Sequence, residues 1–97
     1  IALWPAAIAL AHELAERSLR GLSLLELGAG TGLPGIVAAT LGARVVQTDK
    51  NAAALVVGRR NAERNGAALE QRAADWTEWR EADTYDLIVG AADYQFN

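Results

Sequence analysis

The residues best suited to binding a ligand lie in a glycine-rich segment that follows a short apolar run. The segment reads Glu26-Leu27-Gly28-Ala29-Gly30-Thr31-Gly32-Leu33-Pro34-Gly35. Glycines permit positive φ and let backbone amides approach a ligand closely. A helix after this segment would point its N-terminal amides at the same place, which favours an anionic group such as a carboxylate or phosphate. A tight strand-to-helix turn that binds nothing is the alternative, but the density of glycines favours a binding turn.

The spacing of these glycines bears on which nucleotide the turn would hold. Gly30, Gly32 and Gly35 match the G-x-G-x-x-G dinucleotide fingerprint, and Asp49 lies at a suitable distance beyond them. In that fingerprint the first glycine directly follows the strand, and here Gly28 takes that place. Counted from Gly28, the third glycine would fall on Leu33. The frame therefore disfavours NAD.

Asp49 is the candidate partner for a ribose, because it closes the second apolar strand at its carboxyl end. A carboxylate there can accept hydrogen bonds from two ribose hydroxyls, which NAD and S-adenosylmethionine both carry. The alternative role is a cap for the helix that begins near Ala52, since Asp and Asn are common caps. Asn51 could cap that helix instead and leave Asp49 to the ligand.

Two further groups follow later strands. Asp75 and Trp76 combine an acceptor with an aromatic ring, which suits the amino group and the ring of an adenine. A capped turn with a packing tryptophan is the competing interpretation. After the fourth strand, small residues including Ala92 would let a ligand lie against the backbone.

The elements that must position these groups alternate between helices and strands. The expected helices cover Pro5–Leu19, Leu33–Leu41, Ala52–Asn65 and Trp76–Ala82, and the expected strands cover Leu22–Leu27, Arg44–Thr48, Ala68–Ala73 and Tyr85–Gly90. Such alternation predicts an α/β fold of parallel βαβ units with right-handed crossovers. We expect a Rossmann-like three-layer sandwich with strand order 3-2-1-4 and ligands at the carboxyl ends of strands 1 and 4.

Composition excludes several classes of protein. The 97 residues form one domain or part of one, 52% of them are apolar, and the net charge is −3. The sequence shows no concentration of basic residues of the kind that binds duplex nucleic acid, so we expect no such partner. The absence of cysteine excludes disulfides and thiolate metal sites, and we predict no metal site of another kind. The apolar runs are too short to cross a membrane, so we expect a cytoplasmic protein.

The ends of the chain predict that residues 1–97 are the N-terminal half of a larger domain, truncated at the C-terminus. The chain opens on Ile1 without any methionine and stops at Asn97, just after an apolar strand. A sheet edge at that point would have nothing to cover it. A complete small domain is the alternative.

Several short motifs occur together in a familiar order. They are Leu3-Trp4-Pro5-Ala6-Ala7, the segment from Leu25 to Gly35, Thr48-Asp49, Asn61 with Asn65, Asp75-Trp76 and Ala92-Asp93. The set resembles the seven-β-strand methyltransferases of the methyltransferase-like 21 group, also called lysine methyltransferase family 16. The resemblance runs over nearly all of the chain.

The resemblance implies a cofactor, S-adenosylmethionine, and a set of residues that hold it. The implied contacts come from Trp4, Gly28, Ala29, Gly30, Asp49, Trp76 and Ala92, and our candidate cofactor-binding set adds Glu26, Thr31, Gly32, Lys50 and Asp75.

The resemblance also implies methyl transfer to a protein side-chain amine, usually lysine. We expect Asp93 to be the catalytic residue, orienting or desolvating that amine. The family's Asp-x-x-Tyr motif falls on Asp93–Phe96, so Phe96 lacks the expected hydroxyl near the substrate. The Asn/Asp-Pro-Pro-Tyr motif of enzymes that methylate planar amide or base nitrogens is absent, which disfavours those acceptors.

Two rival functions remain open at this point. One is a fragment of an NAD-dependent oxidoreductase, and the other is a non-catalytic, truncated module that binds a partner through its open sheet edge. We expect the 97 residues alone to be inactive, and their oligomeric state stays open.

Overall fold

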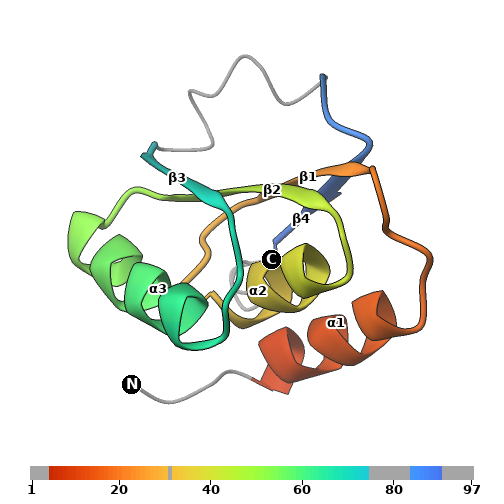
Figure 1. Ribbon diagram of the computed structural model, residues 1–97. Helices are drawn as coiled ribbons and strands as arrows, with labels where there is room; N and C mark the ends of the chain where they lie inside the picture. The colour runs from red at the N-terminus through yellow and green to blue at the C-terminus, as the bar shows by residue number, and fades with distance from the viewer. Residues whose placement is uncertain (1–4, 31, 75–83, 91–97) are drawn as a thin grey trace.

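The computed structural model describes residues 5–30, 32–74 and 84–90, with side chains from residue 8 onward. Three helices and four strands make up this part of the chain (Figure 1). In chain order they are α1 (Pro5–Ala15), β1 (Ser23–Glu26), α2 (Leu33–Thr40), β2 (Arg44–Asp49), α3 (Ala52–Arg64), β3 (Glu70–Ala73) and β4 (Leu87–Val89). The predicted helix over residues 76–82 lies outside the described residues.

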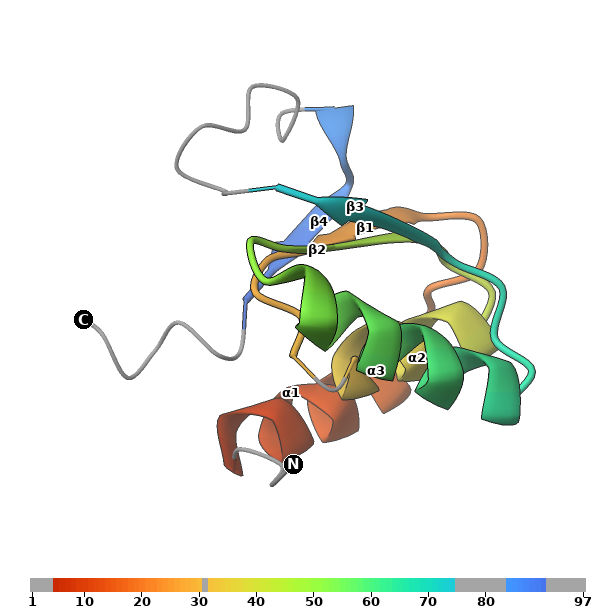
Figure 2. The same ribbon diagram turned by 90° about the vertical axis from the view of Figure 1, so that its left-hand side faces the viewer.

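The four strands form one parallel sheet in the order β3-β2-β1-β4, as the sequence predicted. From β1 the chain adds β2 and β3 on one side and then places β4 on the other side. Such folds bind ligands at this switch point, at the carboxyl ends of the strands. The helices α1, α2 and α3 lie on the same face of the sheet (Figures 1 and 2). The described part of the chain thus contains the sheet and one helical layer of the predicted three-layer sandwich.

The bounds of the first helix differ from the prediction. It ends at Ala15 rather than Leu19, and the chain tightens there through hydrogen bonds from Glu16 N to Glu13 O and from Arg17 N to Leu14 O. Leu19 is then free to pack into the core, where only 2% of it is exposed. Burial of Leu19 against the sheet therefore outweighs continuation of the helix.

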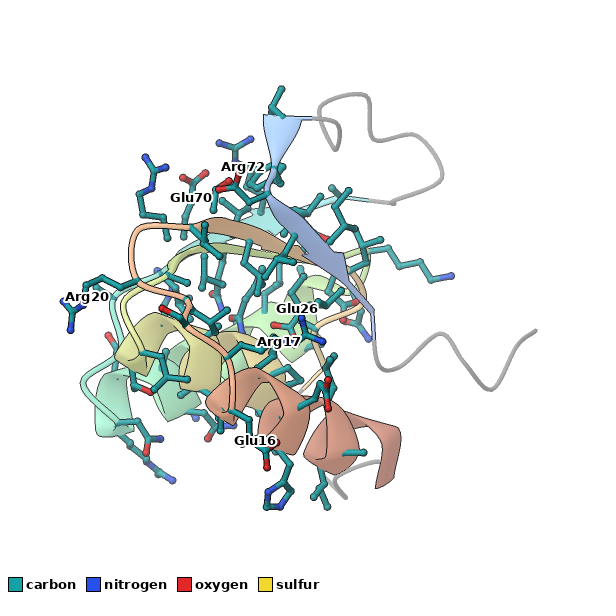
Figure 3. The ribbon with its side chains drawn as sticks, turned by 90° about the vertical axis from the view of Figure 1, so that its right-hand side faces the viewer. Glu16, Arg17, Arg20, Glu26, Glu70 and Arg72 are labelled. Atoms are coloured by element: carbon teal, nitrogen blue, oxygen red, sulfur yellow. The ribbon has the colours of Figure 1, made fainter. Side chains whose placement is uncertain are left out.

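Apolar side chains fill the space between the sheet and the helices. The buried cluster consists of Leu14, Leu19, Leu24, Ala38, Ala43 and Val45. Side chains alternate between the two faces of a strand, so Glu26 lies on the same face of β1 as Leu24, toward the helices. Figure 3 shows Glu26 between the two layers, whereas the ion pair of Glu70 and Arg72 projects from the opposite face.

A pair of polar residues fixes the start of β1 beside the approach to β4. Ser23 N donates to Asp86 Oδ2 at 2.8 Å, and Asp86 N donates to Ser23 Oγ at 3.0 Å. The backbone and side-chain hydrogen bonds from Ser23 hold the pKa of the Asp86 carboxyl below its usual range. These bonds align the start of β1 with the start of its neighbour β4, and the glycine turn lies at the other end of this strand pair.

Candidate cofactor-binding site

At each described position of the turn from β1 into α2 where the backbone is left-handed, the residue is glycine. Gly28, Gly30 and Gly32 have φ values of 60°, 57° and 86°, and no non-glycine residue in the described part of the chain has positive φ. A side chain is strained in this region of backbone conformation. The glycine-rich sequence is therefore needed for the shape of the turn itself.

Neighbouring strands hold this turn on both sides. Leu27 N donates to Val89 O at 2.8 Å, and Ala29 N donates to Thr48 O at 2.9 Å. Because Val89 and Thr48 lie near the carboxyl ends of β4 and β2, the turn sits at the edge where a parallel sheet binds ligands. A Cβ placed on Gly30 would meet none of the described residues within 4 Å, so these residues leave space beside the turn.

Asp49 lies at the same edge and contacts the turn directly. Its Oδ2 accepts a hydrogen bond from Gly30 N at 3.1 Å, and its Oδ1 accepts one from Asn51 N at 2.9 Å. A carboxylate has about four acceptor positions, so each oxygen can still accept another hydrogen bond. The partly exposed Asp49 can therefore take two ribose hydroxyls without losing its contacts to the backbone.

Asn51 caps α3, which is the interpretation of the sequence that leaves Asp49 to the ligand. Its Oδ1 accepts a hydrogen bond from Ala53 N at 2.9 Å. The Asp49 side chain makes no capping bond to this helix in the described structure; it bonds to Gly30 and to the Asn51 amide. The capping role thus falls to Asn51.

The N-terminus of α2 is less open to an anionic ligand than the sequence suggested. Pro34 has no N–H, Gly35 N donates to the Glu26 carboxyl, and Ile36 N donates to Gly32 O. The first turn of this helix is thus largely occupied by the protein's own groups. A ligand phosphate, which needs several free amides, would compete with Glu26 there.

Glu26 itself is buried beneath the turn and only 2% exposed. Burial raises the pKa of Glu26 to about 8, and the nearby charge of Asp49 acts in the same direction. Hydrogen bonds from Gln47 and the Gly35 amide oppose this shift but do not outweigh it. The side chain is therefore mainly a neutral carboxylic acid at pH 7.

The structure brings together one part of the predicted set and leaves the rest undescribed. Gly28, Ala29, Gly30 and Asp49 meet at one edge, Gly32 is the N-cap of α2, and the exposed Lys50 follows Asp49. Outside the described residues lie Trp4, Thr31, Asp75, Trp76, Ala92 and Asp93.

Two functional candidates were missed in the sequence. Gln47 is fully buried in β2, with its Nε2 donating to Glu26 Oε1 at 2.9 Å, and Gln71 Nε2 donates in turn to Gln47 Oε1 at 3.1 Å. A signal was available, because a glutamine that follows Val45 and Val46 in a strand expected to be buried needs a polar partner. Glu26 in the adjacent strand supplies it.

The described residues contain no cluster of three or more His, Asp or Glu side chains of the kind that holds a metal ion. Among the same residues, no helix has the length and apolarity required to cross a bilayer.

The order 3-2-1-4, the glycine turn after β1 and the acidic residue at the end of β2 define a Rossmann-like domain for a nucleoside-containing cofactor. A model of the lysine methyltransferase family matches residues 1–97. The chain therefore belongs to the lysine methyltransferase family.

Two of the similar proteins are named as methyltransferases of protein side chains. The protein N-lysine methyltransferase METTL21A of Danio rerio is 41% identical over 99 residues, covering 92% of this chain and 45% of the relative. The histone-arginine methyltransferase METTL23 of Homo sapiens is 49% identical over 51 residues, covering 50% of this chain and 27% of the relative. The chain thus spans about half the length, or less, of the curated relatives it matches.

A solved structure has the same fold. The Pyrococcus abyssi tRNA (uracil-54, C5)-methyltransferase in complex with S-adenosyl-L-homocysteine is 29% identical, with a TM-score of 0.72. The alignment covers 84% of this chain and 20% of that enzyme.

Proposed function

We propose that the protein is an S-adenosylmethionine-dependent methyltransferase whose acceptor is the side-chain amine of a lysine in another protein. The observation that carries this proposal is the joint position of the glycine turn and Asp49 in a chain of the lysine methyltransferase family. The described residues supply the cofactor side of the site, and residues beyond β4 supply the acceptor side.

The residues present fit the cofactor. Asp49 retains acceptor positions for two ribose hydroxyls, and the open space beside Gly30 leaves room for a ligand against the backbone. The occupied first turn of α2 suits a cofactor without phosphates better than it suits NAD. S-adenosylmethionine has no phosphate group.

The chemistry needs alignment rather than a metal ion. S-adenosylmethionine, held by Asp49 and the glycine turn, would supply an electrophilic methyl group for the nitrogen of the acceptor amine. The protein must hold donor and acceptor together, exclude water and accept the proton that the amine loses. Asp49 and the glycine turn hold the nucleoside, and Asp93 orients the amine in our proposal.

The choice of lysine over arginine rests on the family and on the relative that aligns over most of the chain. That relative is named as an N-lysine methyltransferase, whereas the histone-arginine relative aligns over half of the chain. Phe96, at the position of the family tyrosine, is the residue that we expect to influence acceptor choice.

The first experiment is to measure binding to the full-length protein. Isothermal titration calorimetry should detect S-adenosylhomocysteine and should not detect NAD under the same conditions. The reverse preference would support the oxidoreductase alternative, and binding of neither would support the non-catalytic module. The comparisons favour neither of these alternatives.

The second experiment tests the roles of two acidic residues. Transfer of labelled methyl groups to lysine-containing proteins should be lost in Asp93→Ala although S-adenosylhomocysteine still binds, whereas Asp49→Ala should lose binding. Mass spectrometry of the product would identify the modified side chain. If Asp93→Ala retained full turnover, Asp93 would be reassigned to the scaffold.

The cellular location and the partners of the protein also stay predictions. We expect a cytoplasmic protein that acts on a protein substrate, with no nucleic-acid or membrane partner. Fractionation of cells expressing the full-length protein would test the location directly.

A further inference from the structure

A row of hydrogen-bonded side chains crosses three strands beneath the glycine turn. Gln47 Nε2 donates to Glu26 Oε1 at 2.9 Å, and Gln71 Nε2 donates to Gln47 Oε1 at 3.1 Å. The parallel register pairs Glu26 with Gln47 and Gln47 with Gln71, so the three side chains lie side by side on the helix-facing side of the sheet. We call these three residues the polar row.

The central member of the polar row also reaches the turn. Gln47 Nε2 donates a second hydrogen bond, at 3.0 Å, to the carbonyl oxygen of Gly32. The same oxygen accepts the first intrahelical bond of α2, from Ile36 N at 3.0 Å. Both lone pairs of the Gly32 carbonyl are therefore used, one by the helix and one by the sheet.

Glycines let the helices approach the polar row. A Cβ on Gly35 would lie 2.4 Å from Glu26 Oε1 and 2.7 Å from Gln47 Nε2. A Cβ on Gly58 in α3 would lie 3.1 Å from Gln71 Nε2. Gly35 and Gly58 thus mark where α2 and α3 pack against this layer of polar atoms.

In the described part of the chain, no side chain caps the far end of the turn. Gly32 is the N-cap of α2 and carries no capping side chain. Two hydrogen bonds hold the near end: Ala29 N donates to Thr48 O, and Gly30 N donates to Asp49 Oδ2. Gln47 supplies the corresponding bond at Gly32.

We propose that Gln47 is a positioning residue for the cofactor site, fixing the Gly32 carbonyl and with it the exit of the glycine turn into α2, with Glu26 and Gln71 holding its amide in place. The proposal rests on the proposed function and assigns roles to Gln47 and Gln71, which lie outside the candidate cofactor-binding set. It predicts that the affinity for the cofactor depends on a side chain on the far side of the turn from the ligand.

The main variant is Gln47→Leu in the full-length protein, which replaces the amide side chain with an apolar side chain of similar size. In this variant the Gly32 carbonyl loses the hydrogen bond that it accepts from Gln47 Nε2. Titration calorimetry should show S-adenosylhomocysteine binding weakened about 10-fold or more, the equivalent of one or two lost hydrogen bonds. Hydrogen exchange at the Ile36 amide should become faster as the first turn of α2 loosens.

Thr48→Val is the matched control. Thr48 is the next residue of β2, is 1% exposed, and also donates a buried hydrogen bond, from Oγ1 to Glu26 O at 2.9 Å. Its side chain lies on the opposite face of the strand from Gln47 and bonds to the last residue of β1 rather than to Gly32. Thr48→Val should lower thermal stability yet leave affinity within about twofold and exchange at Ile36 unchanged.

The outcomes separate the possibilities. A folded Gln47→Leu protein with wild-type affinity would overturn the proposal, and so would an equal loss of affinity in Thr48→Val. If Gln47→Leu does not fold, the half-buried Gln71→Leu takes its place and should weaken binding in the same direction by a smaller factor; unchanged affinity in that variant would overturn the proposal. If the wild-type protein itself bound no S-adenosylhomocysteine, the proposed function would fail first.

Discussion

The carboxylate of Asp49 accepts hydrogen bonds from the backbone amides of Gly30 and Asn51, at 3.1 and 2.9 Å. One side chain thus joins the glycine turn after β1 to the residue that caps α3. The acid that we assign to the ribose is also part of the structure of its own site. Loss of this carboxylate would therefore affect both ligand contact and the shape of the turn.

Asp49→Asn should weaken binding of S-adenosylhomocysteine by at least about 10-fold, because an amide group can keep only one of the two acceptor oxygens. The new amide nitrogen would face the Gly30 N–H, a donor against a donor. Titration calorimetry on the full-length protein measures the effect. Asp86→Asn, at the opposite edge of the sheet, is the control and should leave affinity unchanged; equal losses in both variants would argue against a ligand-binding role for Asp49.

Asn51→Ala separates capping from binding. The Asn51 side chain accepts a hydrogen bond from Ala53 N, so its removal should lower the free energy of unfolding by about 1 kcal/mol. The Asn51 backbone amide that bonds to Asp49 remains, and affinity for S-adenosylhomocysteine should therefore change by less than about twofold. Urea denaturation and calorimetry measure the two effects. A large loss of affinity with unchanged stability would reverse the assignment.

Much of this architecture could be predicted from sequence, because it depends on local patterns. Strands alternating with helices predicted the strand order 3-2-1-4, and the glycines predicted a left-handed turn. Asn51 and Asp49 were recognised as alternatives for one cap, and geometry chose Asn51.

The polar row could not be predicted in the same way. It depends on which residues lie opposite one another in the register, which pairs Gln47 with both Glu26 and Gln71 across more than 20 residues of sequence. Glu26 also takes up the Gly35 amide in the first turn of α2, so fewer amides remain there for an anion than the sequence suggested. Local pattern places a turn, but long-range register decides which of its atoms remain available.

Gly35→Ala tests the close contact between α2 and the polar row. The added methyl would lie 2.4 Å from Glu26 Oε1, so we expect a loss of about 1–3 kcal/mol in the free energy of unfolding. Gly58→Ala in α3 is the matched control, since its methyl would lie 3.1 Å from the movable end of Gln71 and alanine favours a helix by about 1 kcal/mol. Gly58→Ala should be close to neutral. Equal effects in urea denaturation would show that the contact at Gly35 relaxes easily.

The buried acid Glu26 predicts an unusual dependence of stability on pH. Its pKa is 4.5 in the absence of burial, and burial raises the pKa of Glu26 to about 8 in the folded protein. Between these values the folded protein keeps a proton that the unfolded chain has lost, so unfolding releases a proton. The contribution of Glu26 to stability is therefore fully present below the lower value and declines as pH rises through this window, by on the order of 1 kcal/mol per pH unit.

Glu26→Gln should remove this dependence, because glutamine resembles the neutral acid and cannot ionise. Denaturation of the wild-type and variant proteins at several pH values from about 5 to about 8 should show the variant gaining stability relative to wild type as pH rises. Parallel curves for the two proteins would mean that Glu26 is ionised in the fold. In that case Gln47 and the Gly35 amide would be compensating a buried charge rather than holding a neutral carboxylic acid.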